Sequence, residues 1–438
     1  MTSTQLKRYA IVGMGVRSSF YYRSIIQDFK DVSKLVGICD TNQTRMNACN
    51  DHMVELGGER LPTYKAEDFD KMIAEQKPDV VIVTTIDRVH HIYCIRAMEL
   101  GCDAITEKPM TIDEEKLQLM IDAEKKTGKQ IRVLFNYRYA PHHTKVRELI
   151  QSGVIGEIMT VHMDWILDCA HGSDFMRRWH RDKNNSGGIQ MHKSIHHFDL
   201  VHFWLNTEPE TVYCVGDLRF YGKQNAEKRG VANLGDRYLN NEEAKNDPFA
   251  IQIDNSPTLK KLYLDAEHED GYIRDRNCFA EGITIEDTLS MIIKYKNRAV
   301  MTYNTYAYAP WEGYRCVFNG SKGRLEITVV EGGYSAALEP VAKKEVQNVD
   351  YIQGGVEKTK IVVYPLFGEP YEVDVIKGEG GHGGGDPVLL HDVIVGDSDK
   401  FNRAAFIRDG GNAVLVGVGA NHSMKSGLPV NVQDLVRW

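Results

Sequence analysis

The stretch Tyr9-Ala10-Ile11-Val12-Gly13-Met14-Gly15-Val16-Arg17-Ser18 decides the fold. Its apolar run predicts a β-strand, its glycines a tight turn, and the residues after them the start of a helix. Gly13 permits the turn, and Gly15 lets the backbone approach a pyrophosphate on the amides of a helix N-terminus. Ser18 replaces the third glycine of the usual fingerprint, so an unrelated glycine turn is the alternative. The predicted dinucleotide-binding residues here are Gly13, Met14, Gly15, Val16, Arg17 and Ser18.

An acidic residue one βαβ unit later supports the dinucleotide prediction. The second apolar run, Leu35–Cys39, predicts another strand, and Asp40 ends it. A carboxylate at that place accepts hydrogen bonds from the adenine-ribose hydroxyls and repels a 2′-phosphate. The sequence therefore favours NAD over NADP as the cofactor.

Strand and helix patterns alternate up to about residue 134. The run Val80-Val81-Ile82-Val83-Thr84 is typical of a strand covered on both faces, and Ala104-Ile105-Thr106 predicts another. In open parallel sheets, ligands bind beyond the carboxyl ends of the strands. Thr84, Glu107 and Lys108 fall at those ends, together with Gly13 and Asp40, so we predict that they contact the cofactor.

The pattern changes after residue 135. Segments 158–163, 211–215, 288–295, 299–306 and 315–318 alternate apolar and polar residues, which indicates an antiparallel sheet with one covered face. The predicted fold is α/β, with an N-terminal Rossmann doubly wound parallel sheet and a C-terminal α/β domain with a large, open, mainly antiparallel sheet. We expect a dinucleotide-binding domain at 1–134 and a substrate-binding and oligomerisation domain at 135–438. The second domain has a polar excursion at about 221–270 and a terminal helix at about 404–427, which we expect to pack near the first domain.

Composition excludes several classes of partner. The 438-residue chain has a net charge of −8, a pI near 6.1 and a mean hydropathy of −0.38. This balance gives no electrostatic footprint for nucleic acid or for an anionic membrane, and no apolar run approaches membrane-spanning length. The eight cysteines form no CxxC pair, which favours reduced thiols. We therefore expect a cytoplasmic protein that binds neither nucleic acid nor membrane.

Two segments carry the candidate catalytic groups. Lys108 lies in a Glu-Lys-Pro turn at a strand tip, where it would bind a substrate hydroxyl and favour its alkoxide; the alternative is a solvated surface lysine. If the chain is helical from Gln190, His192, His196 and Asp199 share one face, and a histidine can accept the hydroxyl proton. Two histidines at this spacing also suit zinc. No third ligand follows in the sequence, so we expect no metal.

Substrate-binding candidates occur in three further segments. The aromatic stretch 303–315 could stack on sugar rings and bind hydroxyls, although a tyrosine-rich core strand is equally ordinary. A loop expected around residues 171–180 gathers His171, Arg177, Arg178, Trp179 and His180. The many glycines of the run 380–386 would let the backbone approach a ligand closely. With the Tyr-Arg-Tyr-x-Pro segment, the candidates are Tyr139, Trp179, His180, Tyr306, Trp311, Arg315 and His382.

These motifs, in this order, resemble the glucose–fructose oxidoreductase / inositol dehydrogenase / rhizopine-catabolism (Gfo/Idh/MocA) family over nearly the whole chain. The motifs are the glycine turn, Glu107-Lys108-Pro109, the segment 136–141 and the Gly-Gly…His…His…Asp run from Gly187. The resemblance implies a Rossmann domain followed by an α/β domain that supports the substrate. It also implies a homodimer or homotetramer, and oxidation or reduction of a secondary hydroxyl of sugars, inositols or their acids.

The resemblance also assigns roles to single residues. Lys108 matches the family's active-site lysine and His196 its catalytic histidine, whereas His192 stands where many members carry a catalytic aspartate. Which histidine is the base therefore stays open. We expect an NAD-dependent dehydrogenase of a sugar, glycoside or cyclic polyol. The alternatives are an NAD-dependent glycoside hydrolase, which works by transient oxidation and elimination, and a non-catalytic sugar or dinucleotide sensor.

Overall fold

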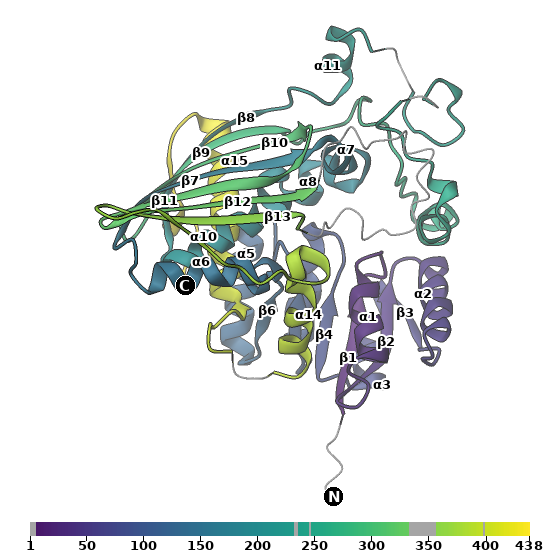
Figure 1. Cartoon of the computed structure of the whole chain (residues 1–438). Coiled ribbons are helices and arrows are strands. Elements are labelled where there is room, and N and C mark those ends of the chain that lie inside the picture. The colour runs from purple at the N-terminus through teal and green to yellow at the C-terminus, as the bar shows by residue number, and fades with distance from the viewer. Residues whose placement is uncertain (1–5, 232–234, 245–246, 333–355, 397–398) are drawn as a thin grey trace, which may run out of the picture.

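The computed structural model describes residues 6–231, 235–244, 247–332, 356–396 and 399–438. In this part of the chain the strands form two sheets, one above the other in Figure 1. The seven-stranded sheet has the order β15-β6-β5-β4-β1-β2-β3, and the nine-stranded sheet has the order β14-β13-β12-β11-β7-β10-β9-β8-β16.

The seven-stranded sheet is parallel except for its edge strand β15. Its strands are β1 (Lys7–Val12), β2 (Ser33–Asp40), β3 (Thr63–Lys65), β4 (Val80–Val83), β5 (Asp103–Thr106), β6 (Ile131–Val133) and β15 (Ala405–Phe406). The intervening helices are α1 (Ser18–Gln27), α2 (Gln43–Glu55), η1 (Ala66–Asp68), α3 (Phe69–Gln76), η2 (Asp87–Val89), α4 (His90–Glu99) and α5 (Glu114–Thr127). Every residue of β4 is buried, as expected for a strand that helices cover on both faces.

The nine-stranded sheet is antiparallel except between β7 and β10. Its strands are β7 (Ile158–Asp168), β8 (Pro209–Asp217), β9 (Thr288–Tyr295), β10 (Val300–Ala309), β11 (Glu312–Gly320), β12 (Gly323–Gly332), β13 (Lys358–Pro365), β14 (Tyr371–Val373) and β16 (Val430–Asn431). Burial alternates along β9 and β10, so one face is covered and the other is open. The two sheets confirm the predicted fold class.

The helices of the second half lie mainly between the sheets and beside them (Figure 1). They are η3 (Asn136–Tyr139), α6 (Pro141–Gln151), α7 (Cys169–Arg177), η4 (Trp179–Arg181), α8 (Lys183–Ser186), α9 (Ile189–His192), α10 (Ile195–Leu205), α14 (Gly381–Ile394), α15 (Ile407–Ser426) and η10 (Val432–Asp434). Between β8 and β9 the chain forms short helices: α11 (Lys223–Lys228), η5 (Glu242–Ala244), η6 (Ile253–Asn255), α12 (Pro257–Leu259), the π-helix η7 (Lys260–Leu264) and α13 (Glu267–Asp270). Helix α15 contacts both β8 and β6 and so joins the two sheets.

The expected helix from Gln190 is broken, and this expectation was wrong. Helix α9 ends at His192 and α10 begins at Ile195. The Ser194 amide donates to the carbonyl of Ile189, five residues back, so the α-helical hydrogen-bond register is interrupted there. His192 and His196 consequently point to different partners.

A buried ion pair ties the second half of the chain together. Arg138 on η3 donates to both carboxylate oxygens of Asp199 on α10, at 2.7 and 2.5 Å, and to Asp409 on α15 at 3.0 Å. Arg138 and Asp199 are almost fully buried. Removing one partner would leave a buried charge without its counter-ion, which is strongly destabilising. Asp199 is therefore bound by a structural partner.

Candidate active site

The glycine turn has the close backbone approach that a diphosphate site requires. Gly13 has a φ of +91°, and a Cβ there would lie 2.5 Å from the amide nitrogen of Thr85. At Gly15 a Cβ would lie 3.4 Å from the hydroxyl of Tyr263. The Val16 amide donates a hydrogen bond to that same hydroxyl at 3.0 Å. A side chain from the excursion between β8 and β9 thus reaches the turn.

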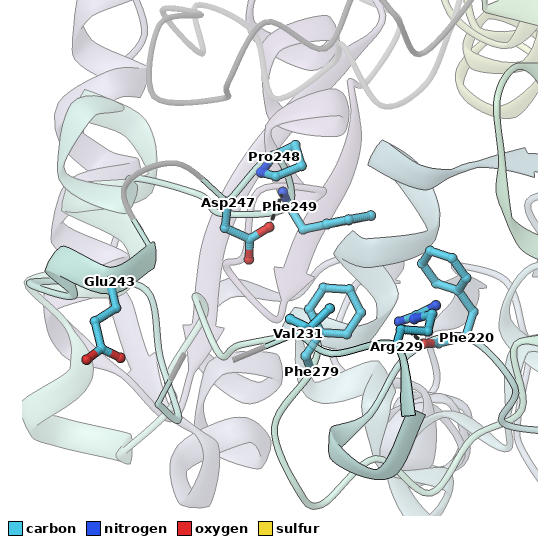
Figure 2. A pocket seen from close by; sticks show the side chains of 8 residues that line it. All are labelled: Phe220, Arg229, Val231, Glu243, Asp247, Pro248, Phe249 and Phe279. Atoms are coloured by element: carbon cyan, nitrogen blue, oxygen red, sulfur yellow. Dashed lines mark hydrogen bonds between the residues drawn. The ribbon is translucent and has the colours of Figure 1, made fainter. Parts of the chain in front are cut away.

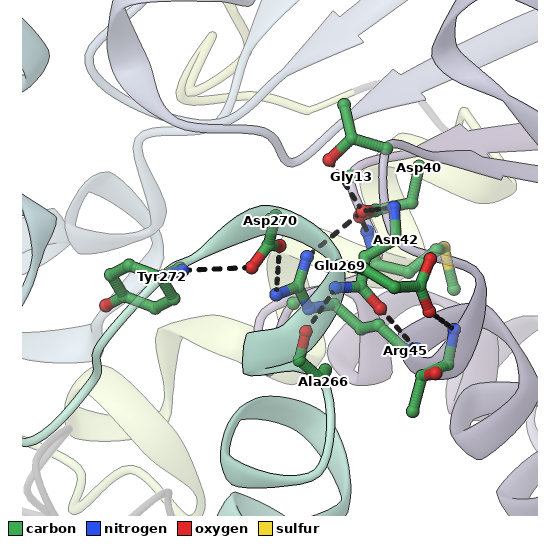
Figure 3. A network of polar contacts seen from close by, with 12 residues as sticks. Gly13, Asp40, Asn42, Arg45, Ala266, Glu269, Asp270 and Tyr272 are labelled. Atoms are coloured by element: carbon green, nitrogen blue, oxygen red, sulfur yellow. Dashed lines mark hydrogen bonds and ion pairs between the residues drawn. The ribbon is translucent and has the colours of Figure 1, made fainter.

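Asp40 lies at the end of β2, but its carboxylate already has several protein partners. It accepts hydrogen bonds from the amides of Met14 at 2.6 Å and Asn42 at 2.9 Å, and from Arg45 Nη1 at 3.0 Å. Arg45 also pairs with Asp270 of α13 at 2.8 Å. Figure 3 shows this network, which joins β2 and α2 to the excursion. Asp40 and Asp270 together outweigh the single positive charge of Arg45, so the group keeps a net negative charge.

Two other predicted cofactor residues hold the turn itself. The Thr84 hydroxyl donates to the carbonyl of Gly13 at 2.5 Å, and the Ser18 hydroxyl donates to the carbonyl of Gly15 at 2.7 Å. Both side chains fix backbone that a dinucleotide would approach. The glycine turn, Asp40 and these hydroxyls together fit a dinucleotide.

Glu107 connects the first helix to the strand tip that carries Lys108. Arg17 Nε donates to Glu107 Oε1 at 2.5 Å, and the Tyr21 hydroxyl donates to the same oxygen. Burial raises the pKa of Glu107, but Arg17 and the Tyr21 hydroxyl outweigh it and hold the pKa below its usual range. The charged Glu107 and its partners position the backbone that carries Lys108.

Lys108, His192 and Asp87 form a continuous polar chain. Lys108 Nζ lies 3.3 Å from His192 Nε2 and donates to the His192 carbonyl at 3.0 Å. His192 Nδ1 lies 2.5 Å from Asp87 Oδ2. With Asp87 ionised, Nδ1–H donates to the carboxylate and Nε2 is left as an acceptor that faces Lys108. The two domains meet here, because Asp87 and Lys108 follow β4 and β5 whereas His192 ends α9.

Burial shifts the pKa of each of these three groups in the direction that favours its neutral form. It lowers the pKa of Lys108 from 10.5 to about 8, against the opposing effect of Asp87 and Glu107. Burial, and then the charge of Lys108, holds the pKa of His192 well below its usual range. Burial raises the pKa of Asp87 well above its usual value, while Lys108 opposes the shift. The shifts favour a neutral His192 imidazole beside the Lys108 amine, which is the form of histidine that can accept a proton.

His196 lies on the other side of the same region. Its ring stacks on Tyr137 with centroids 4.5 Å apart, and the ring of His382 lies 6.1 Å from it. His382 has a φ of 50° and its Nδ1 lies 2.9 Å from Asp386 Oδ2. Among the described residues, the buried Nδ1 of His196 has no hydrogen-bond partner. A buried polar atom of this kind is suited to a substrate hydroxyl.

The structure brings some of the other predicted substrate residues to this region. The His180 ring lies 4.0 Å from the His192 ring, and Trp179 stacks on His180 at 3.7 Å. Trp311 lies in the turn before Glu312, whose carboxylate is 3.9 Å from the buried Lys193 ammonium.

The other three predicted substrate residues lie elsewhere. Tyr306 is half-buried and Arg315 is exposed, and both lie on the open face of the nine-stranded sheet. The Tyr139 hydroxyl donates to Asp392 and accepts from Arg132. The structure does not bring these three side chains to Lys108.

Sequence reasoning missed three residues that the structure places in the site. Asp87 is not among the residues that the sequence predicts for the site, although it lies three residues beyond Thr84, which follows a strand. Tyr137 was noted only as part of a motif, and Tyr263 lies in the excursion, which has weak periodicity. Asp87 could have been identified because it follows the carboxyl end of a parallel strand, where ligands of such sheets bind. No local pattern marks Tyr263, because its role depends on a contact with a turn 247 residues earlier.

A separate cavity of about 490 Å³ lies within the excursion (Figure 2). Its lining is largely aromatic and comprises Phe220, Arg229, Val231, Glu243, Asp247, Pro248, Phe249 and Phe279. It includes none of the residues around Lys108, so it is not the site described above. Over the described ranges, no cluster of three or more His, Cys, Asp or Glu side chains could hold a metal ion. The same ranges contain no helix both long and apolar enough to cross a membrane.

Comparisons with known proteins find relatives for both halves of the chain. Residues 7–135 match the model "Oxidoreductase family, NAD-binding Rossmann fold", and residues 147–432 match "Oxidoreductase family, C-terminal alpha/beta domain". YteT of Bacillus subtilis (strain 168), named as an oxidoreductase, is 32% identical over 98% of this chain and 99% of its own length. A glycosyl hydrolase family 109 protein of Shewanella baltica (strain OS185) is 23% identical over 95% of this chain and 82% of its own.

The fold also matches solved structures. The WlbA dehydrogenase from Bordetella pertussis, solved in complex with NADH and UDP-GlcNAcA, has a TM-score of 0.62 at 18% identity. That match covers 98% of this chain and 99% of the WlbA chain. With both domain models matched in order and a full-length relative above 30% identity, the chain belongs to the Gfo/Idh/MocA oxidoreductase family.

Proposed function

We propose that this chain is an NAD-dependent oxidoreductase that acts on a secondary hydroxyl of a sugar, glycoside or cyclic polyol. The observation that carries the proposal is the partly buried chain Asp87–His192–Lys108, which lies at the carboxyl ends of β4 and β5. It lies at the same sheet edge as the glycine turn and Asp40, where ligands of such folds bind. The chemistry that the cofactor supplies, once bound, is hydride transfer.

The protein's own residues would manage the proton of the reacting hydroxyl. The Lys108 ammonium would donate a hydrogen bond to the substrate oxygen and stabilise the developing alkoxide. His192 Nε2, 3.3 Å from Lys108 Nζ, would accept the hydroxyl proton, and Asp87 would hold the imidazole in the required tautomer. His196 Nδ1 would bind a neighbouring hydroxyl. The O–H proton would pass to histidine, and the hydride released from the C–H bond would pass to the bound NAD⁺, so that the alcohol loses one proton and, as a hydride, two electrons.

The charges at the adenosine end support NAD over NADP. Asp40 and Asp270 carry two negative charges around the single positive charge of Arg45. A 2′-phosphate placed beside this group would meet net negative charge. Binding of NADH should therefore be tighter than binding of NADPH, which titration calorimetry measures directly.

The direct test mixes the purified protein with NAD⁺ and a panel of sugars, glycosides and inositols. A rise in absorbance of the reduced cofactor with at least one compound supports the proposal. Lys108→Ala should abolish that rise and still bind NAD⁺. Wild-type turnover by Lys108→Ala would contradict the assignment of this lysine.

An NAD-dependent glycoside hydrolase is the second candidate. Its support is the alignment with the Shewanella baltica family 109 protein, which spans 95% of this chain. Aryl glycosides separate the two functions: release of the phenol without net reduction of NAD⁺ indicates hydrolysis. The site argues against the sensor alternative. Removing the charged and polar groups of Asp87, His192 and Lys108 from water costs free energy, and a sensor has no need of a proton acceptor.

We further propose a homodimer or homotetramer that pairs through the open face of the nine-stranded sheet. Apolar side chains on that face are exposed, with Val215 at 53% and Ile292 at 50%. Light scattering on the purified protein would measure the mass in solution. A monomeric mass would contradict this proposal.

A further inference from the structure

The excursion between β8 and β9 places one of its side chains on the cofactor turn. Residues 253–272, here called the strap, include η6, α12, the π-helix η7 and α13. The strap's Tyr263 lies in η7, and its hydroxyl accepts the Val16 amide hydrogen at 3.0 Å. In Figure 1 the excursion lies beside α1 and α2, the helices that follow β1 and β2.

The Tyr263 hydroxyl takes up a backbone amide of the glycine turn, and amides of such turns are the groups that bind a diphosphate. An amide N–H makes one good hydrogen bond, so the hydroxyl and a phosphate oxygen compete for Val16. The hydroxyl also lies only 3.4 Å from where a Cβ of Gly15 would be, so it packs directly against the glycine at which a diphosphate would approach the backbone. A dinucleotide that uses this turn must first displace the Tyr263 side chain.

The two ends of the strap are held with different strength. Helix α13 is anchored to α2, because Glu269 accepts from the amides of Gln43 at 2.8 Å and Thr44 at 2.7 Å, and Lys65 pairs with it at 2.9 Å. Asn42 also donates to the carbonyl of Ala266 at 2.9 Å (Figure 3).

The π-helical turn has fewer such bonds to the first domain. Besides the Val16 bond, Arg45 donates to the Leu262 carbonyl at 3.1 Å, and its guanidinium lies 5.6 Å from the Tyr263 ring. π-Helical turns are rare and occur often at functional sites. The π-helical turn is thus the end of the strap with fewer hydrogen bonds to the first domain.

We propose that η7 is a gate on the diphosphate subsite, closed by the Tyr263 hydroxyl and opened when the dinucleotide takes the Val16 amide. This inference rests on the proposed function, because it requires a dinucleotide at the glycine turn. Arg45 would connect the two events, since it bonds both Asp40, the residue predicted to bind the ribose, and the Leu262 carbonyl of the gate. Closure reduces the apparent affinity for the cofactor by the fraction of molecules in which the gate is open.

The test measures NADH binding without turnover, by stopped-flow fluorescence and calorimetry. Tyr263→Phe removes the competing hydroxyl and keeps the ring, so it should bind NADH about fivefold more tightly, the change expected for one net hydrogen bond. The gain should come from faster association. Tyr371→Phe, at an exposed tyrosine on the edge strand β14, is the matched control and should leave binding unchanged.

Amide hydrogen exchange on the wild-type protein gives a second measurement. Adding NADH should speed exchange in residues 259–264 and leave 267–270 protected. Unchanged or weaker NADH binding by Tyr263→Phe, or slower exchange in 259–264, overturns the gate and leaves the proposed function standing. Absence of NADH binding by the wild-type protein overturns both.

Discussion

Replacing Lys108 by methionine should remove turnover and at the same time make the folded protein more stable at neutral pH. Burial lowers the pKa of this lysine from 10.5 to about 8. The difference corresponds to a free-energy cost of about 3 kcal/mol for keeping the ammonium in the folded protein. Methionine has a similar length and no charge, so it avoids this cost. About 3 kcal/mol is an upper value, because the Lys108 side chain keeps some contact with solvent.

The stability difference between Lys108→Met and the wild type depends on pH, because the pKa of Lys108 differs between the folded and the unfolded chain. Below pH 8 the lysine is protonated in both the folded and the unfolded chain, so the folded state carries the whole cost. Between pH 8 and 10.5 the unfolded chain binds more protons than the folded one, and the free energy of unfolding of the wild type rises with pH. Above 10.5 both forms are neutral and the cost is gone. The advantage of Lys108→Met is therefore full at pH 7 and shrinks towards pH 10.

Thermal unfolding of both proteins across this pH range measures the effect. We expect Lys108→Met to melt a few degrees higher than the wild type at pH 7, and the gap to narrow steadily above pH 8. Lys125→Met, at an exposed lysine on α5, is the control and should show no such gap. A Lys108→Met protein that is less stable at pH 7, or a gap that widens with pH, would refute the argument that this lysine is buried at a cost.

Three further variants test other parts of the structure. Asp87→Asn should keep NADH binding and lower kcat by about 10²- to 10⁴-fold, because an amide no longer selects the reactive tautomer of its histidine; near-normal kcat would exclude that role. Asp199→Asn should destabilise the fold by about 3 kcal/mol or more, since Arg138 loses its buried counter-ion, and an unchanged melting temperature would contradict this. Gly13→Ala should abolish NADH binding in calorimetry, because a Cβ there meets the Thr85 backbone at 2.5 Å; retained affinity would show that the turn can move.

Local patterns were sufficient to predict the fold class. Continuous β-branched runs such as residues 80–84 indicate strands covered on both faces, and alternating runs such as 288–295 indicate a sheet with one open face. The predicted strand 288–295 coincides with β9. The reason is that burial on one face or two leaves a period in the residues themselves. The same logic placed Asp40 and Lys108 at strand ends.

The site depended on contacts that no local pattern records. On a continuous helix, His192 and His196 would share one face. In the structure the helix is interrupted after α9, so that His192 contacts Lys108 whereas His196 stacks on Tyr137. Asp87 was recognised as a residue of the site only from its hydrogen bond with His192 in the structure.

By itself, the sequence determined that this protein has a glycine turn, an acidic strand end and a strand-tip lysine on a parallel sheet. Each of these features is set by the few residues around it, through backbone freedom and burial. Tertiary structure alone decided that His192 contacts Lys108, that the Asp87 carboxylate binds this histidine, and that Tyr263 of the excursion contacts the glycine turn. Those partners lie up to 247 residues apart, and their proximity arises from the packing of the two sheets and the excursion as a whole.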